Sequence, residues 1–176
     1  MTTPVFLLFG AHGDLAMRML WPSLFRLHCD KSLPEAMQIY GLGRSGTTNE
    51  LREQLHQSLA DEVNDSNRVQ FEQFLEKTAF IKLEAGQELD YQALAKYLAE
   101  KSQHVALAYL SMPPDLFAPI VENLHHAKLI TSDTRIILEK PIGKDLASSR
   151  AISDAVAEVL DEQQTYRIDH YLGKEA

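Results

Sequence analysis

Hydrophobic residues along the chain follow two alternating patterns. Short segments rich in apolar residues occur six times, and the first of them, residues 5–9, is apolar without interruption, which is typical of a strand covered on both faces. Between these segments, hydrophobic residues recur three or four positions apart, which is the spacing of an amphipathic helix. The expected strands are residues 4–9, 38–42, 78–83, 105–110, 135–138 and 165–168. Six strands alternating with helices predict a doubly wound parallel α/β sheet, and we expect residues 1–176 to form a single domain.

Individual residues predict where the helices begin and break. Pro22 lacks a backbone N–H and clashes with the preceding turn, so we expect a break or kink near residues 20–21 of the first helix. The expected N-caps of three later helices are Thr48 or Asn49, Asp90 and Asp145. The helix after residue 48 has an apolar stripe that extends to residue 63.

The first strand ends in a segment with two glycines, Gly10 and Gly13. Glycine permits a tight turn and lets the backbone approach a ligand closely. A helix beginning at Asp14 or Leu15 directs its free N–H groups to the same place, which suits a pyrophosphate. The spacing is sparser than the full G-x-G-x-x-G pattern, so on its own the segment also fits an ordinary turn.

Other chemically distinctive residues also follow predicted strands. Arg44 follows the second strand, Pro113 and Pro114 the fourth, Lys140 the fifth, and residues 169–170 the sixth. Parallel sheets bind ligands outside the carboxyl ends of their strands. This shared edge favours the nucleotide interpretation of the glycine segment over the turn, and it predicts a Rossmann-like dinucleotide-binding domain.

Arg44 indicates which dinucleotide is preferred. An acidic residue at the end of the second strand would bond the ribose 2′-hydroxyl of NAD, whereas a nearby arginine accommodates the 2′-phosphate of NADP. A guanidinium can hold that phosphate through two hydrogen bonds, so the sequence predicts NADP. The alternative is a solvated arginine in a turn.

Two further groups could bind anions. Lys140 precedes Pro141, which excludes helix there and favours an extended or cis geometry that presents the ammonium at the sheet edge. The last residues place a carboxylate, an imidazole and an ammonium close together, at Asp169, His170 and Lys174. They form a candidate phosphate-binding cluster, and the alternative is a polar tail.

Composition excludes several classes of protein. The 176 residues carry 17 Lys and Arg against 25 Asp and Glu, a formal charge of -8 that disfavours nucleic acid and anionic membranes as partners. Cys29 is the only cysteine, so an internal disulfide is impossible and a reducing cytoplasm is expected. We expect no leader, no membrane span and no metal site.

The motifs together resemble the N-terminal coenzyme-binding domain of the glucose-6-phosphate dehydrogenase family. The resemblance extends over essentially the whole chain and rests on residues 10–16, Arg44, residues 109–114, residues 139–143 and residues 167–175. It implies oxidation of the C1 hydroxyl of glucose 6-phosphate to the lactone with NADP, as in the pentose phosphate pathway of glucose metabolism.

The resemblance also implies roles for individual residues. Asp169 would orient a catalytic histidine. The sugar phosphate would be bound by His170, Tyr171 and Lys174, and Lys140 would bridge coenzyme and sugar. The coenzyme would be bound by Gly10, Ala11, His12, Gly13, Asp14, Leu15, Arg44, Glu84, Ala85, Met112, Pro113 and Lys140.

The sequence departs from the family pattern at two positions. His12 stands where the family usually has Ser or Thr, and it would bring a bulky ring close to a phosphate. Met19 stands where the family has a substrate-binding lysine, and methionine cannot bind a phosphate.

The family's catalytic histidine lies well downstream, in a second α+β domain beyond Ala176. We therefore expect the chain to bind NADP without turnover on its own, with an incomplete site for glucose 6-phosphate. The alternative is a stand-alone dinucleotide-binding or regulatory paralogue, one that pairs with a full-length subunit. Because an edge that meets a second domain exposes apolar surface, we also expect self-association.

Overall fold

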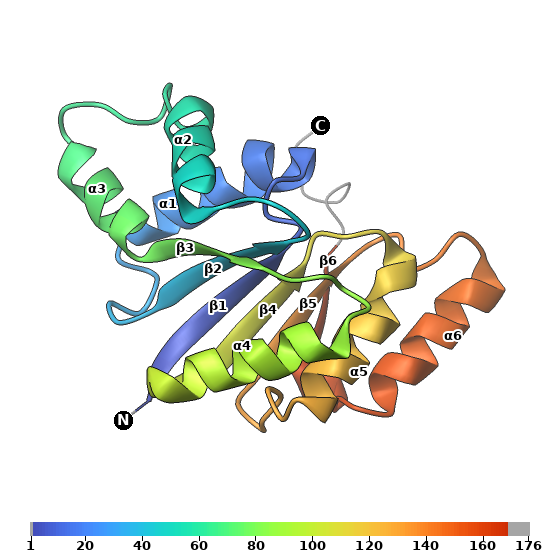
Figure 1. The fold of residues 1–176 in the computed structure, drawn as a ribbon. Helices are drawn as coiled ribbons and strands as arrows, with labels where there is room; N and C mark the ends of the chain where they lie inside the picture. Colours follow the sequence, from blue (N-terminus) through green and yellow to red (C-terminus); the bar gives the residue numbers. More distant parts are fainter. Residues whose placement is uncertain (1, 169–176) are drawn as a thin grey trace.

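The computed structural model describes residues 2–168, and within this range a parallel sheet forms the centre of the molecule (Figure 1). The strands are hydrogen-bonded in the order β3-β2-β1-β4-β5-β6, which confirms the predicted doubly wound topology. Their bounds are β1 Thr3–Phe9, β2 Gln38–Gly43, β3 Thr78–Lys82, β4 Gln103–Leu110, β5 Arg135–Glu139 and β6 Thr165–Ile168.

The helices lie on both faces of the sheet. The first half of the chain places α1, α2 and α3 on one face, and the second half places α4, α5 and α6 on the other (Figure 1). The α-helices are α1 Trp21–Cys29, α2 Thr48–Ser58, α3 Arg68–Glu76, α4 Glu88–Glu100, α5 Phe117–His126 and α6 Leu146–Ala157. Shorter helical segments are η1 Ala16–Leu20, η2 Pro114–Leu116 and η3 Glu162–Gln164.

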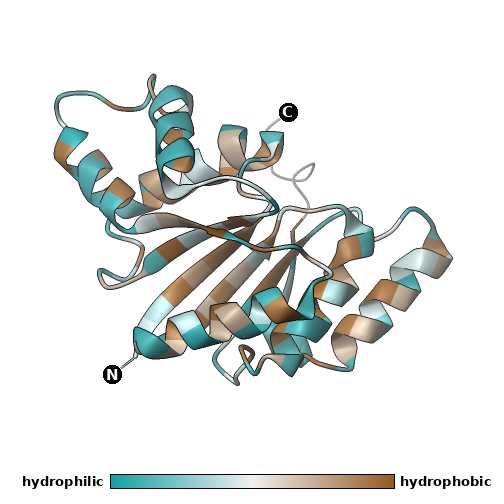
Figure 2. Cartoon of the chain, viewed as in Figure 1, coloured by the Kyte–Doolittle hydropathy of each residue, from teal (hydrophilic) through white to brown (hydrophobic). Residues whose placement is uncertain are grey.

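Alternate side chains of the strands pack into two hydrophobic clusters, one on each face. In β1, Leu7 belongs to the cluster under α4 and α5, whereas Leu8 belongs to the cluster under α1 to α3. The strands are accordingly apolar on both sides, while the helices carry polar residues on their outer faces (Figure 2). Trp21 is fully buried in the second cluster, as expected for a core residue.

The first helix changes its hydrogen bonding at the predicted position, residues 20–21, but does not end there. Residues 14–29 form a continuous helix in which residues 16–20 have π-helical hydrogen bonding. The N–H of Trp21 bonds to the carbonyl of Ala16, five residues earlier. This wider turn gives the Pro22 ring room, so the helix accommodates the proline without ending.

Two of the predicted N-caps are displaced, whereas Asp145 caps α6 as expected. Thr47, not Thr48 or Asn49, caps α2 by accepting a hydrogen bond from the N–H of Glu50. Helix α4 begins at Glu88 and thus precedes Asp90, whose carboxylate instead accepts a bond of 2.8 Å from the N–H of Glu84. Helix α2 also ends at Ser58, short of its expected apolar stripe, because the chain turns after Leu59.

The two faces of the sheet are covered unequally. Within residues 2–168, α1, α2 and α3 cover β1, β2 and β3 but leave the same face of β4, β5 and β6 without a helix (Figure 1). Leu107, Ile137 and Ile168 on that face are only partly buried, and Tyr166 is 53% exposed. This half of the sheet therefore presents apolar side chains to solvent.

Gly41 in β2 provides a test of the packing beneath α1. A Cβ at Gly41 would lie 2.7 Å from the Cβ of Ala11 and 3.3 Å from Cζ2 of Trp21. We expect Gly41→Ala to lower the free energy of unfolding by about 1–3 kcal/mol through overpacking, measured by urea denaturation. Gly86→Ala is the matched control, because a Cβ there meets nothing within 4 Å. Equal effects of the two substitutions would contradict this account.

Candidate coenzyme-binding site

The glycine segment after β1 makes a tight turn that only glycine fits at its first position. Gly10 has a φ of +76°, and a Cβ there would collide with the backbone oxygen of Ser111. The loops after β1 and β4 consequently touch at this point.

Some amides of this segment are used by the fold and others are not. The N–H groups of Gly10 and Ala11 both donate to the carbonyl of Leu42, at 3.0 and 3.2 Å. The N–H of Gly13 donates to the carbonyl of Gly10. Three further amides, those of His12, Asp14 and Leu15, have no acceptor among residues 2–168. These three donors at the start of a helix form a suitable site for an anion such as a pyrophosphate.

Trp21 fixes the segment from beneath. Its indole N–H donates a buried hydrogen bond of 2.9 Å to the carbonyl of Ala11. Because an unpaired buried carbonyl costs about 1–3 kcal/mol, this bond holds the segment against the first helix.

Beside Gly10 the structure has a cavity of about 320 Å³ at the carboxyl edge of the sheet. Six residues predicted from the sequence line it: Gly10, Arg44, Glu84, Ala85, Met112 and Pro113. The sequence patterns did not indicate its apolar floor, formed by Phe9, Leu42 and Leu83, nor the lining residues Gly43, Gly86 and Leu116. The available signal was position, because each floor residue lies at or just beyond the carboxyl end of one of the first three strands.

The loop after β3 is held by three hydrogen bonds. Besides the bond from Glu84 to Asp90, the carbonyl of Ala85 accepts from the hydroxyl of Tyr91 at 2.9 Å and from the side-chain amide of Asn123 at 3.2 Å. Burial of the Tyr91 ring raises the pKa of its hydroxyl, which keeps that donor protonated. One wall of the cavity is therefore fixed by α4 and α5.

Arg44 follows β2 with an exposed side chain that has no ion pair among residues 2–168. Its segment continues through Gly46, which has a φ of +131°, to the N-cap Thr47. A guanidinium at the mouth of the cavity is therefore available to an external anion.

Lys140 does not line this cavity, although it was predicted to contact the coenzyme. It is exposed at the end of β5, its N–H donates to the carbonyl of Ile168, and its peptide bond to Pro141 is cis. The predicted substrate residues Asp169, His170, Tyr171 and Lys174 lie outside the described residues.

Tyr109, at the carboxyl end of β4, is a titratable group near this edge of the sheet. Burial raises the pKa of its hydroxyl, and the neighbouring Glu139 carboxylate raises it further. The hydroxyl consequently stays protonated near neutral pH.

The His12 side chain contacts α2 and β3. Its Nδ1 lies 2.6 Å from Oε1 of Gln54 on α2, and its ring lies 4.7 Å from the ring of Phe80 on β3. The ring therefore occupies space between the glycine segment and the adjacent elements.

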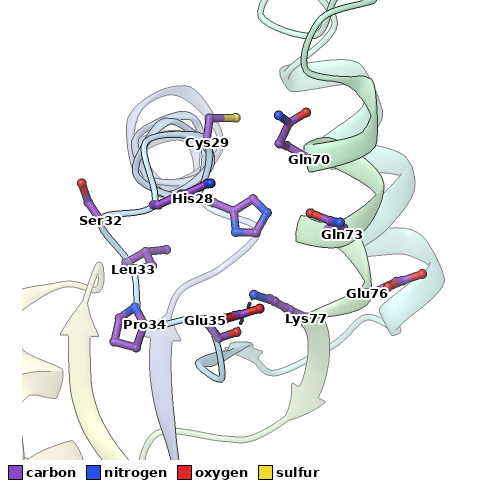
Figure 3. A pocket seen from close by; sticks show the side chains of 11 residues that line it. His28, Cys29, Ser32, Leu33, Pro34, Glu35, Gln70, Gln73, Glu76 and Lys77 are labelled. Atoms are coloured by element: carbon purple, nitrogen blue, oxygen red, sulfur yellow. Dashed lines mark hydrogen bonds between the residues drawn. The ribbon is translucent and has the colours of Figure 1, made fainter.

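A larger cavity, of about 870 Å³, lies near the C-terminal ends of α1 and α3, by the amino edge of β2 and β3 (Figure 3). The His28 ring extends from α1 toward α3, and the Lys77 ammonium donates to the carbonyl of Glu35. Burial lowers the pKa of His28, aided by Lys77, and burial also raises the pKa of the Cys29 thiol, which disfavours the reactive thiolate. Of the residues predicted to bind coenzyme or substrate, none that the structure describes lines this cavity.

The fold and the site define a dinucleotide-binding domain of the Rossmann type. Its glycine segment, helix start and second-strand arginine meet at the carboxyl edge of the sheet, beside the point where strand order reverses between β1 and β4. Among the described residues, no helix is both long and apolar enough to cross a membrane.

Comparison with known proteins identifies the family. The family described as glucose-6-phosphate dehydrogenase, NAD binding domain, matches residues 7–176. Glucose-6-phosphate 1-dehydrogenase of Rhizobium meliloti is 35% identical over 173 residues, covering 97% of this chain and 35% of that protein. The enzyme of Mycolicibacterium smegmatis is 37% identical over 180 residues, covering 97% of this chain and 36% of that protein.

Solved structures of the same family have a similar fold. A glucose-6-phosphate dehydrogenase in complex with its substrate glucose-6-phosphate superposes with a TM-score of 0.86 at 31% identity, covering 99% of this chain and 38% of that one. The structure of glucose-6-phosphate 1-dehydrogenase from Mycobacterium avium superposes with a TM-score of 0.84 at 33% identity, covering 97% of this chain and 37% of that one. The chain belongs to the glucose-6-phosphate dehydrogenase family, which uses NADP, and matches its coenzyme-binding domain. It spans a little over a third of the length of these relatives.

Proposed function

We propose that residues 1–176 form one NADP-binding domain of a cytoplasmic dehydrogenase that oxidises the C1 hydroxyl of glucose 6-phosphate in the pentose phosphate pathway. The observation that carries the proposal is the cavity beside Gly10, which brings the glycine segment and Arg44 to one edge of the sheet. In this assignment the amides of His12, Asp14 and Leu15 bind the pyrophosphate, and Arg44 binds the 2′-phosphate. The nicotinamide accepts a hydride when bound, and the chain's own residues position the coenzyme.

The coenzyme assignment is tested by Arg44→Ala. We expect NADP affinity to fall about tenfold to a hundredfold, because a hydrogen bond to a charged group is worth about 1.5–3 kcal/mol. Affinity for NAD, which lacks the 2′-phosphate, should stay unchanged, and both are measured by isothermal titration calorimetry. The control is Arg68→Ala, because Arg68 is exposed at the start of α3 and pairs only with Asp65 among the described residues. Tighter binding of NAD than of NADP by the unaltered chain would contradict the assignment.

Turnover requires a general base, and the described residues bring no histidine to this cavity. A hydroxyl proton is removed efficiently only by a base within hydrogen-bond reach. We therefore expect the chain with NADP and glucose 6-phosphate to produce no NADPH, followed by absorbance. Turnover by the chain alone would refute this assignment of roles.

A dinucleotide-binding or regulatory paralogue without dehydrogenase activity is the second candidate. Met19 favours it, because this side chain is 45% exposed on η1, where the family resemblance predicts a substrate-binding lysine. A fusion of this chain to the remainder of the M. smegmatis relative separates the two candidates. Activity of the fusion, with a lower KM for glucose 6-phosphate after Met19→Lys, supports the dehydrogenase; an inactive but NADP-binding fusion supports the paralogue.

The uncovered face of β4, β5 and β6 supports the expectation of self-association. Tyr166 and the partly buried Leu107 and Ile137 offer apolar contact area on this face. We expect the purified chain to form dimers or larger species at high concentration in light scattering. The control is Leu146→Ser. Leu146 is an exposed leucine on α6, which covers the opposite face of the sheet, so this substitution should leave association intact. A monodisperse monomer would contradict the expectation.

A further inference from the structure

The His12 side chain connects three elements that the sequence gives no reason to join. His12 belongs to the glycine segment, and its Nδ1 lies 2.6 Å from Oε1 of Gln54 on α2. Its ring packs on the ring of Phe80 of β3, with the two rings tilted by 41°. The residue is half-buried even though it belongs to a loop. Its contacts are thus directed to the fold and leave the backbone amide of His12 unbonded among residues 2–168.

Gly46 completes the contact. A Cβ at Gly46 would occupy the position of Nε2 of His12, and this nitrogen is buried without a hydrogen-bond partner among the described residues. The Gly46 backbone therefore packs directly against the imidazole, in a conformation, φ +131°, that side chains rarely adopt. Any shift of Gly46 toward the glycine segment is blocked by the ring.

This contact lies within the segment that carries Arg44. The segment is fixed at one end by β2, which ends at Gly43, and at the other by Thr47, the N-cap of α2. Between these two points, residues 44–46 have no backbone hydrogen bond to another described residue. Gly46 lies against two rings, those of His12 and Phe80, and the His12 ring is the one that belongs to the glycine segment. It therefore limits how closely residues 44–46 approach the unbonded amides of His12, Asp14 and Leu15.

We propose that His12 is a positioning residue for coenzyme discrimination: its imidazole fixes the separation between the pyrophosphate-binding amides and Arg44, and so determines the preference for NADP over NAD. The inference rests on the proposed function. The pyrophosphate and the 2′-phosphate of NADP are joined through one ribose, so both can be bound at full strength only when the two protein segments keep one separation. NAD uses the amides alone and does not depend on this separation.

Binding measurements on His12→Ala test the inference. We expect NADP affinity to fall about tenfold, within the range of coupling for residues in one network, while NAD affinity changes much less. His104→Ala is the matched control, since that half-buried imidazole is bonded to Thr2 at the opposite edge of the sheet. In the Arg44→Ala background, His12→Ala should affect both coenzymes equally. Equal losses for both coenzymes in the otherwise unaltered chain would show a structural role only and overturn the inference.

A second measurement does not depend on coenzyme binding. In the coenzyme-free chain, His12→Ala should lower the backbone ¹⁵N order parameters of residues 45–47 and leave those of residues 84–86 unchanged. Unchanged order parameters at residues 45–47 overturn the inference whether or not coenzyme binds. If the unaltered chain binds neither NADP nor NAD, the proposed function fails and the discrimination role fails with it, while the relaxation data still decide whether His12 holds the segment.

Discussion

The arrangement of the site depends on the backbone of Ala11, whose N–H and carbonyl both form hydrogen bonds. Its N–H donates to Leu42 at the end of β2, and its carbonyl accepts from the buried indole of Trp21. Buried polar groups need such partners, so the segment cannot move without losing both bonds. Gly41 belongs to the same constraint, because the absence of a side chain there lets Ala11 and Trp21 lie against β2. The glycine segment is thereby attached to the second strand and the first helix together.

From this fixed segment, the site separates structural and binding roles among neighbouring backbone groups. The amides of Gly10, Ala11 and Gly13 are used within the protein, whereas those of His12, Asp14 and Leu15 are not bonded within the described residues. A chain with a net charge of -8 can attract a phosphate only through such local donors and a well-placed cation. The proposed role of the chain is accordingly to hold and orient a coenzyme.

The unequal cover of the sheet follows from its topology. The chain builds the sheet outward from β1, first toward β3 and then from β4 toward β6. The helices that connect the strands of the first half lie on one face, and those that connect the strands of the second half lie on the other (Figure 1). On the opposite face, α4 and α5 lie against the centre of the sheet, but the face of β4, β5 and β6 on the α1 side stays open within residues 2–168 (Figure 1). The coenzyme edge and this apolar face adjoin, so a partner on this face would also lie near the site.

The sequence by itself determined the strands, the topology class and the residues at the carboxyl edge, because apolar runs of length four to eight and glycine after a strand have direct backbone causes. Arg44 and Pro113 were located in this way, whereas residues 84–85 and Met112 came from the family resemblance, and the cavity brings all of them together. Only the tertiary structure decided which amides stay unbonded, where the His12 ring lies, and that Lys140 is outside the cavity. Those outcomes depend on partners distant in sequence, such as Leu42, Gln54 and Phe80, which no local pattern specifies. The sequence placed a change in the first helix at residues 20–21, and the structure gave its form, a π-helical segment at residues 16–20 from which the helix continues through Pro22.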